Sequence, residues 1–240
     1  YDPTKLTVDP NDGAITVSFT YAAVDAASQQ DPTPATVAMP FTSSSSPANL
    51  LLVKRITAIN GTPLNVFKDD TEILHAADDN NVNWPTPLNT NTALGDTTIS
   101  TFLRGAIDAG KVKPGDTIEY TIYFLNAGGG NASNVRVCDR ITGAQKFPSG
   151  STIQLQQNSA TPTALTSSDD TDRATFYASS SNPAITNCNF TGTPTIDNGA
   201  IVVDVTGATG SPTWTTLPGS TGPSTANTYG LVRFTTKVNP

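Results

Sequence analysis

The residues that could do acid–base chemistry are one histidine, His75, and several pairs of adjacent aspartates. A Ser–His–Asp hydrolase needs an imidazole base, but His75 lies in a polar tract and the sequence has no G-x-S-x-G motif. A glycosidase needs a carboxyl group with a raised pKa inside a cleft, whereas Asp69-Asp70 lies in a tract typical of surface loops. The H-E-x-x-H and phosphate-binding glycine motifs are absent. We therefore predict that the chain is not an enzyme, and a secreted glycan-active enzyme is the weakest alternative.

Clustered aspartates could instead bind calcium, because Ca²⁺ prefers hard oxygen ligands on neighbouring loop positions. The candidate ligands lie in two polar tracts: Asp78, Asp79, Asp169, Asp170 and Asp172. Neither tract matches the D-x-[DN]-x-[DN]-G loop, so solvated acidic loops are the alternative. We predict no cofactor other than this calcium.

Cys138 and Cys188 are the two cysteines of the chain, too few for a thiolate zinc site and without C-x-x-C spacing. The sequence therefore predicts one disulfide, with two buried free thiols as the alternative. The bond would close a loop of about 50 residues and restrict the unfolded chain by about 4 kcal/mol in the loop-entropy account.

Three asparagines, Asn60, Asn131 and Asn189, fit the N-x-[ST] pattern for glycosylation. Such triplets also arise by chance in a chain rich in Asn and Thr. Glycosylation at these positions is therefore a hypothesis that depends on the host cell.

Composition limits the partners and the location of the chain. The net charge of −7 and the pI near 4.5 repel phosphate backbones, so we expect no nucleic-acid partner. No run of about 18 apolar residues occurs, so we expect no membrane insertion of the mature form. The sequence opens at Tyr1 without Met, which we interpret as removal of a signal peptide from an extracellular or cell-surface protein.

The elements that would position these residues are predicted to be strands. Hydrophobic residues make up only 36% of the chain and charged residues 14%, and Thr, Ser, Asn, Gly and Pro favour strands and turns. Segments with strand patterns are 50–59, 117–125, 135–141, 151–156, 173–177, 200–205 and 229–238. Within them, 117–125 and 135–141 are predicted to be neighbouring strands with one solvated face. Long polar tracts at 67–91 and 159–172 are predicted to be insertions between strands.

Residues 1–49 differ from residues 50–240, which we predict to form the main domain. Ile15, Val17, Phe19 and Tyr21 alternate with polar residues, the pattern of a strand with one buried side. The Pro-, Gln- and Ser-rich tract from about Asp25 to Pro47 is predicted to be a linker. The strand could complete the sheet of a neighbouring subunit, or fold back on its own domain as an ordinary edge.

The chain resembles an Ig-like repeat module of bacterial exported surface and fimbrial proteins, in a version associated with cyanobacteria. The residues that carry the resemblance are Val112-Lys113-Pro114-Gly115-Asp116, Tyr120-Thr121-Ile122, Asn126, Ala132-Ser133-Asn134-Val135, Asn83-Trp84-Pro85 and the ends 52–61 and 229–234. The resemblance implies an Ig-like antiparallel β-sandwich but no reaction. Lys-to-Asn isopeptide bonds occur in related fimbrial modules, so Lys54 on one core strand with Glu119 on another is a further hypothesis to test for such a bond.

Together these observations predict an all-β, Ig-like antiparallel β-sandwich with long polar loop insertions and an extended N-terminal arm. The predicted function is a structural subunit of an extracellular filament or pilus, in which identical subunits form a head-to-tail homopolymer through the donated strand. The alternative is a monomeric surface adhesion or carbohydrate-binding module that displays its loops from the sandwich.

Overall fold

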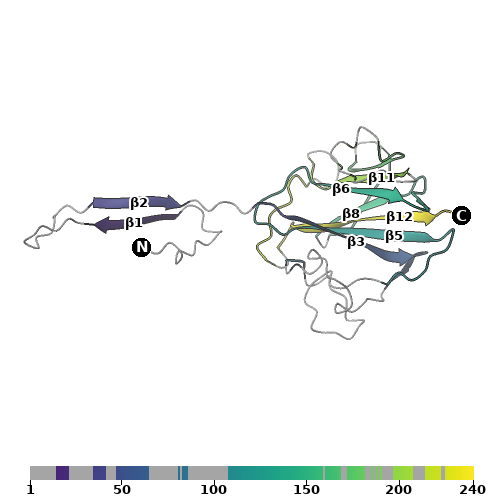
Figure 1. The fold of residues 1–240 in the computed structure, drawn as a ribbon, viewed down its shortest axis with the longest axis horizontal. Helices are drawn as coiled ribbons and strands as arrows, with labels where there is room; N and C mark the ends of the chain where they lie inside the picture. The colour runs from purple at the N-terminus through teal and green to yellow at the C-terminus, as the bar shows by residue number, and fades with distance from the viewer. Residues whose placement is uncertain are drawn as a thin grey trace, which may run out of the picture. The chain divides into compact units, whose positions relative to one another are not determined.

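The computed structural model divides the chain into two compact units, Tyr1–Ser46 and Pro47–Pro240, and each is considered by itself (Figure 1). The structure describes the backbone of residues 15–21 and 35–41 in the first unit. In the second unit it describes residues 47–64, 81, 83–85, 108–158, 160–168, 172–181, 185, 188, 190, 197–207, 214–222 and 225–240.

The first unit contains an antiparallel two-stranded ribbon. Strand β1 (Ile15–Tyr21) pairs with β2 (Ala35–Phe41), so that Ile15 lies opposite Phe41 and Tyr21 opposite Ala35. The segment predicted to be a donor strand is therefore already paired within its own arm, and β2 lies inside the tract predicted to be a linker. The sequence signal for β2 is weak because Ala and Pro interrupt the alternation of Val37, Met39 and Phe41.

The larger sheet of the second unit follows the order β4-β3-β5-β12-β8-β9, with β7 also pairing with β12. Its strands are β3 (Leu50–Ile59), β4 (Thr62–Pro63), β5 (Thr117–Asn126), β7 (Gln145–Lys146), β8 (Ile153–Gln157), β9 (Thr163–Leu165) and β12 (Tyr229–Val238). All pairings are antiparallel. The predicted strand segments 50–59, 117–125, 151–156 and 229–238 coincide with β3, β5, β8 and β12.

The smaller sheet has the order β10-β11-β6, from strands β6 (Arg136–Thr142), β10 (Ala174–Tyr177) and β11 (Asp197–Asp204). Figure 1 shows β6 and β11 in one layer and β3, β5, β8 and β12 in the other. Buried residues from both sheets form one core, including Phe124 and Phe234 of the larger sheet and Val137 and Ile201 of the smaller one. The predicted all-β antiparallel β-sandwich is thus confirmed, and the described part of the chain contains no α-helix.

The predicted pairing of segments 117–125 and 135–141 is wrong. Strand β5 lies between β3 and β12, whereas β6 pairs with β11 in the opposite sheet. The chain crosses from one sheet to the other between Asn126 and Arg136. Alternation shows which residues of a strand face the core, but it carries no information about the partner strand.

The outer face of β5 is also less solvated than predicted. Thr121 and Leu125 have no exposed surface, and Leu125 packs with Leu51, Tyr229 and the fully buried Trp84. A second, smaller cluster therefore covers part of the larger sheet on the side away from the main core.

Candidate functional site

The arm's ribbon has one face made wholly of apolar residue types. Because residues opposite each other in an antiparallel pair share a face, the register places alternate positions of β1 together with alternate positions of β2. The positions on this face are Ile15, Val17, Phe19, Tyr21, Ala35, Val37, Met39 and Phe41. The other face carries Thr16, Ser18, Thr20, Thr36, Ala38 and Pro40. The alternation predicted for β1 thus continues across β2.

Strand β3 is an edge of the larger sheet along most of its length. One side of β3 pairs with β5, while on the other side, among the residues that the structure describes, only Ala58 and Ile59 pair, with the short β4. Leu52 lies opposite Phe124, so it faces the core side of the sheet. Nevertheless, Leu50 and Leu52 are 46% and 50% exposed. The smaller sheet therefore does not extend over this end of β3.

Strand β6 is the corresponding edge of the smaller sheet. It pairs with β11 on one side, and its other edge has no ladder partner among the described residues. We call the region bounded by this edge of β6 and by Leu50 and Leu52 of β3 the open side of the sandwich. It combines an unpaired strand edge with exposed leucines on a face that is elsewhere buried.

An ion pair links the two strands at the open side. The Lys54 Nζ lies 2.6 Å from Asp139 Oδ2 and 4.3 Å from the centre of the Tyr120 ring. Burial raises the pKa of Asp139, and the nearby Lys54 ammonium opposes this rise. The pair therefore joins β3 of the larger sheet to β6 of the smaller one.

The hypothesis of a bond between Lys54 and Glu119 is wrong. Lys54 lies opposite Ile122 on the core side of the sheet, whereas Glu119 is three positions from Ile122 and faces the other side. There Glu119 Oε1 accepts a hydrogen bond from the Thr57 hydroxyl (2.7 Å) and lies 3.6 Å from Arg233 Nε. Asp139, which sequence reasoning did not select, is the carboxylate beside Lys54.

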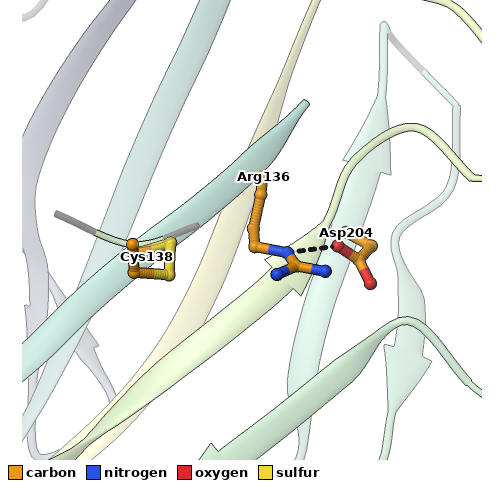
Figure 2. The surroundings of a disulfide bond; sticks show 4 residues. Arg136, Cys138 and Asp204 are labelled. Atoms are coloured by element: carbon orange, nitrogen blue, oxygen red, sulfur yellow. Dashed lines mark hydrogen bonds and ion pairs between the residues drawn. A yellow bond between two sulfur atoms is a disulfide. The ribbon is translucent and has the colours of Figure 1, made fainter. Parts of the chain in front are cut away.

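The predicted disulfide between Cys138 and Cys188 is confirmed, with 5.8 Å between the two Cα atoms. Cys138 lies on β6 beside Arg136, whose Nε donates a hydrogen bond to Asp204 Oδ1 of β11 (2.6 Å) (Figure 2). The disulfide is thus on the outer face of the smaller sheet, since Val137 and Ile141 of the same strand enter the core.

A small apolar cluster surrounds the disulfide. Its buried members are Ile185, Ala200 and Val202, and both cysteines pack against them. The guanidinium of Arg140 lies over the ring of Phe190, 4.8 Å from its centre. The bond therefore ties the segment around 185–190 to the outer face of β6 and β11.

The Pro114-Gly115-Asp116 turn connects the start of β5 to the turn after β3. Gly115 has a φ of +91°, a conformation that favours glycine. The Asp116 Oδ2 accepts a hydrogen bond from the Lys113 N–H (2.7 Å), and its Oδ1 accepts one from Asn60 Nδ2 (2.9 Å). These hydrogen bonds, first that from Asn60, lower the pKa of Asp116.

Asn60 and Asn131, two predicted glycosylation sites, are exposed, and Asn189 lies outside the described residues. Asn60 has a φ of 51° in the turn between β3 and β4, and its Oδ1 accepts from the Thr117 N–H (2.8 Å). Asn131 Oδ1 accepts a long hydrogen bond from the Gly219 N–H (3.4 Å). Glycosylation at these positions stays a prediction.

Among the predicted calcium ligands, only Asp172 is described; Asp78, Asp79, Asp169 and Asp170 lie outside the described residues, as does His75. Asp172 Oδ2 accepts from the Thr166 N–H (2.6 Å) and Oδ1 from the Ala174 N–H (2.9 Å). Both oxygens of this carboxylate thus hold the loop before β10. In the part of the chain that the structure describes, no group of three or more His, Cys, Asp or Glu residues is placed to hold a metal ion.

Asn126 joins three segments within the second unit, a role that the sequence did not reveal. It has no exposed surface, and its Oδ1 accepts from the N–H groups of Asn49 (3.0 Å) and Gly128 (3.2 Å). Its Nδ2 donates to the carbonyls of Gly130, Leu217 and Pro218. One side chain therefore joins the segment before β3, the turn after β5 and the segment before β12.

No family model, curated protein or solved structure matches the chain. Among the described residues, no helix is long and apolar enough to span a membrane.

Proposed function

We propose that the chain is a structural subunit of an extracellular filament, in which the N-terminal arm of one subunit adds to the β-sandwich of the next. Adding a strand to an exposed sheet edge uses backbone hydrogen bonds for affinity and alternate side chains for specificity. A contact between two different surfaces of identical subunits extends without limit when its rotation does not close a ring.

The observation that carries this proposal is the ribbon of the first unit. A two-stranded ribbon is marginally stable in water, and it needs a further strand or a packing surface. The ribbon's face of eight apolar residue types would gain stability by burial at about 25 cal/mol per Å² of apolar surface. Another subunit supplies such a surface in a filament.

The extracellular location is supported by the disulfide. Disulfides persist mainly in oxidising compartments, and Cys138 and Cys188 are joined here. The low content of charged residues and the many Thr, Ser and Asn residues are compatible with a surface protein.

The test uses the full chain with single substitutions on the two faces of β1. Val17→Asp places a charge on the apolar face, and Ser18→Asp places the same charge on the polar face as a matched control. We expect the wild type and Ser18→Asp to form filaments in electron micrographs and Val17→Asp to remain monomeric in sedimentation velocity. Filaments of Val17→Asp equal in number to those of wild type would refute the proposal. A wild-type protein that is monomeric at every concentration would favour the adhesion or carbohydrate-binding module.

A further inference from the structure

Several strands of the second unit have an edge that is wholly or mostly without a ladder partner among the described residues, and these edges differ in length; those of β4 and β7 have only two residues each. Strands β9 and β10 have three and four residues, whereas β6 has seven and β3 has ten. Short edges offer few backbone groups to an added strand. The two long edges, β3 and β6, both border the open side of the sandwich.

The exposed leucines show where the core lacks cover. Leu50 and Leu52 are on the core side of β3, yet about half of each side chain is exposed. A strand added to the outer edge of β6 would extend the smaller sheet over β3, because the two sheets lie face to face. It would then bury both leucines within the sandwich.

Charge favours the arm as the occupant of this site. Residues 1–46 carry five aspartates and one lysine, a net charge of −4. Strands β3 and β6 carry Lys54, Arg55, Arg136 and Arg140 against Asp139, and Asp204 of β11 pairs with Arg136, which leaves a net charge of +2 in a chain that is acidic overall. Neither β1 nor β2 contains a charged residue, so an added strand would bring no charge into the core. Opposite charges around an apolar contact favour this orientation of two copies.

Within the arm, β1 suits the edge of β6 better than β2 does. Both β1 and β6 are seven residues long. Pro40 in β2 has no N–H to donate, whereas every residue of β1 has one. The outer edge of β1 can therefore form an uninterrupted ladder while its inner edge keeps β2.

We infer that the open side is the acceptor site of the filament, where β1 of a second copy pairs with the outer edge of β6 and covers Leu50 and Leu52. This inference rests on the proposed function, because it names the surface that receives the arm. It also assigns the two halves of the contact to different parts of one chain, so donor and acceptor can be disabled separately.

The experiment uses full-length variants that each lack one half of the contact. Leu52→Glu disables the acceptor, and Val112→Glu is its control. Val112 is also a large exposed apolar residue (40%), but it precedes the start of β5, whereas Leu52 pairs with Phe124 near the end of that strand. Val17→Asp disables the donor. Each variant is first compared with wild type by thermal unfolding, and since Leu52 is half exposed we expect Leu52→Glu to unfold within a few degrees of wild type.

We expect Leu52→Glu to raise the protein concentration needed for filaments about tenfold or more, and Val112→Glu to leave it unchanged. A mixture of Leu52→Glu and Val17→Asp should form a one-to-one dimer in sedimentation velocity, because the intact arm of the first fits the intact acceptor of the second. Each variant alone should be monomeric.

Other outcomes would overturn either the proposed function or the assignment of the open side as the acceptor. If Leu52→Glu assembles like wild type while Val17→Asp does not, the arm drives assembly but the acceptor lies elsewhere. If both variants are monomeric and their mixture forms no dimer, the open side is not the acceptor. If Val17→Asp itself assembles like wild type, the proposed function fails. A monomeric wild type whose unfolding temperature falls on Val17→Asp substitution would mean that the ribbon folds onto its own domain, and both statements would fail.

Discussion

Lys54 of β3 and Asp139 of β6 form an ion pair across the two sheets, with 2.6 Å between Nζ and Oδ2. The carboxylate is the more buried partner, since its side chain is 15% exposed and that of Lys54 39%. Breaking a buried pair by removing one partner is more damaging than replacing both, because it leaves a charge without compensation. We therefore expect removal of Lys54 alone to destabilise the fold more than replacement of both residues, and we expect this effect to depend on pH.

Replacing Lys54 with Met should destabilise the fold at neutral pH by about 1–2 kcal/mol, reduced from the value for a fully buried pair because Lys54 is partly exposed. Burial raises the folded-state pKa of Asp139 above 3.8, and removing Lys54 raises it further. At a pH above its folded-state pKa, the charged form of Asp139 therefore lowers the stability of the fold. As pH falls through that pKa towards 3.8, protonation removes this cost.

Urea unfolding of wild type and Lys54→Met across a pH series measures this difference. We expect the difference in free energy of unfolding between wild type and Lys54→Met to narrow as the pH falls. The difference between Asp139→Asn and the double variant Lys54→Met/Asp139→Asn should not narrow. A gap that is constant with pH would contradict the assignment of Asp139 as the buried charge.

Replacing Cys138 and Cys188 with Ser should lower the melting temperature by about 5–15 °C, since a loop of this length contributes up to about 4 kcal/mol. A reducing agent should lower the melting temperature of the wild type by a similar amount and leave the double variant unchanged. Alkylation of both cysteines in the unreduced protein would rule out the bond in solution.

Replacing Asn126 with Ala should cost about 2–4 kcal/mol, because five backbone groups would each lose a hydrogen bond to this buried side chain, and of these the Leu217 carbonyl keeps its bond from the Ala132 N–H. Asn131→Ala is the matched control, since Asn131 is exposed and accepts one long hydrogen bond, so its loss should stay within about 0.5 kcal/mol. Denaturant unfolding measures both. Equal losses for the two variants would show that the Asn126 network adds little stability.

Replacing Gly128 with Ala should destabilise the domain by about 1–3 kcal/mol through a steric clash. A Cβ at this position would lie 2.1 Å from the Pro47 carbonyl oxygen and 2.6 Å from the Asn49 nitrogen, both of them backbone atoms. Gly61→Ala, where a Cβ meets no atom within 4 Å but φ is +75°, measures the cost of backbone strain alone. Denaturant unfolding should show the larger loss of stability for Gly128→Ala. An unchanged stability of this variant would mean that the segment before β3 can move away from the added Cβ at little cost.

Local patterns in the sequence predicted much of the sandwich. Strand β5 was found because Ile118, Tyr120, Ile122 and Phe124 alternate with polar residues, and all four are buried or packed against the core. The disulfide followed from the absence of any other cysteine. The first signal depends on a single segment and the second on a single residue type, so neither requires knowledge of how distant segments pack.

What the sequence did not predict depends on contacts between distant segments. The partner of Lys54 was sought on another strand of the same sheet, but which carboxylate faces Lys54 depends on how the two sheets stack. Trp84 lies in a polar tract, and only the folded structure shows that it covers Leu125 of β5. The pairing of β1 with β2 was hidden for a related reason, since Pro40 and the alanines weaken the strand pattern of β2.

Strand β12 has a consequence for the order of folding. It lies between β5 and β8, so the two halves of the larger sheet, β4-β3-β5 and β8-β9, are joined through the strand that is synthesised last among them. Until β12 has emerged, both β5 and β8 have an unpaired edge and the main core lacks Val232 and Phe234. Pairings between residues far apart in sequence form slowly, and unpaired edges in partly folded chains promote aggregation. From the emergence of β9 until β12 is made, a growing chain therefore carries two incomplete half-sheets, and completion of β12 is the step that commits it to the native topology.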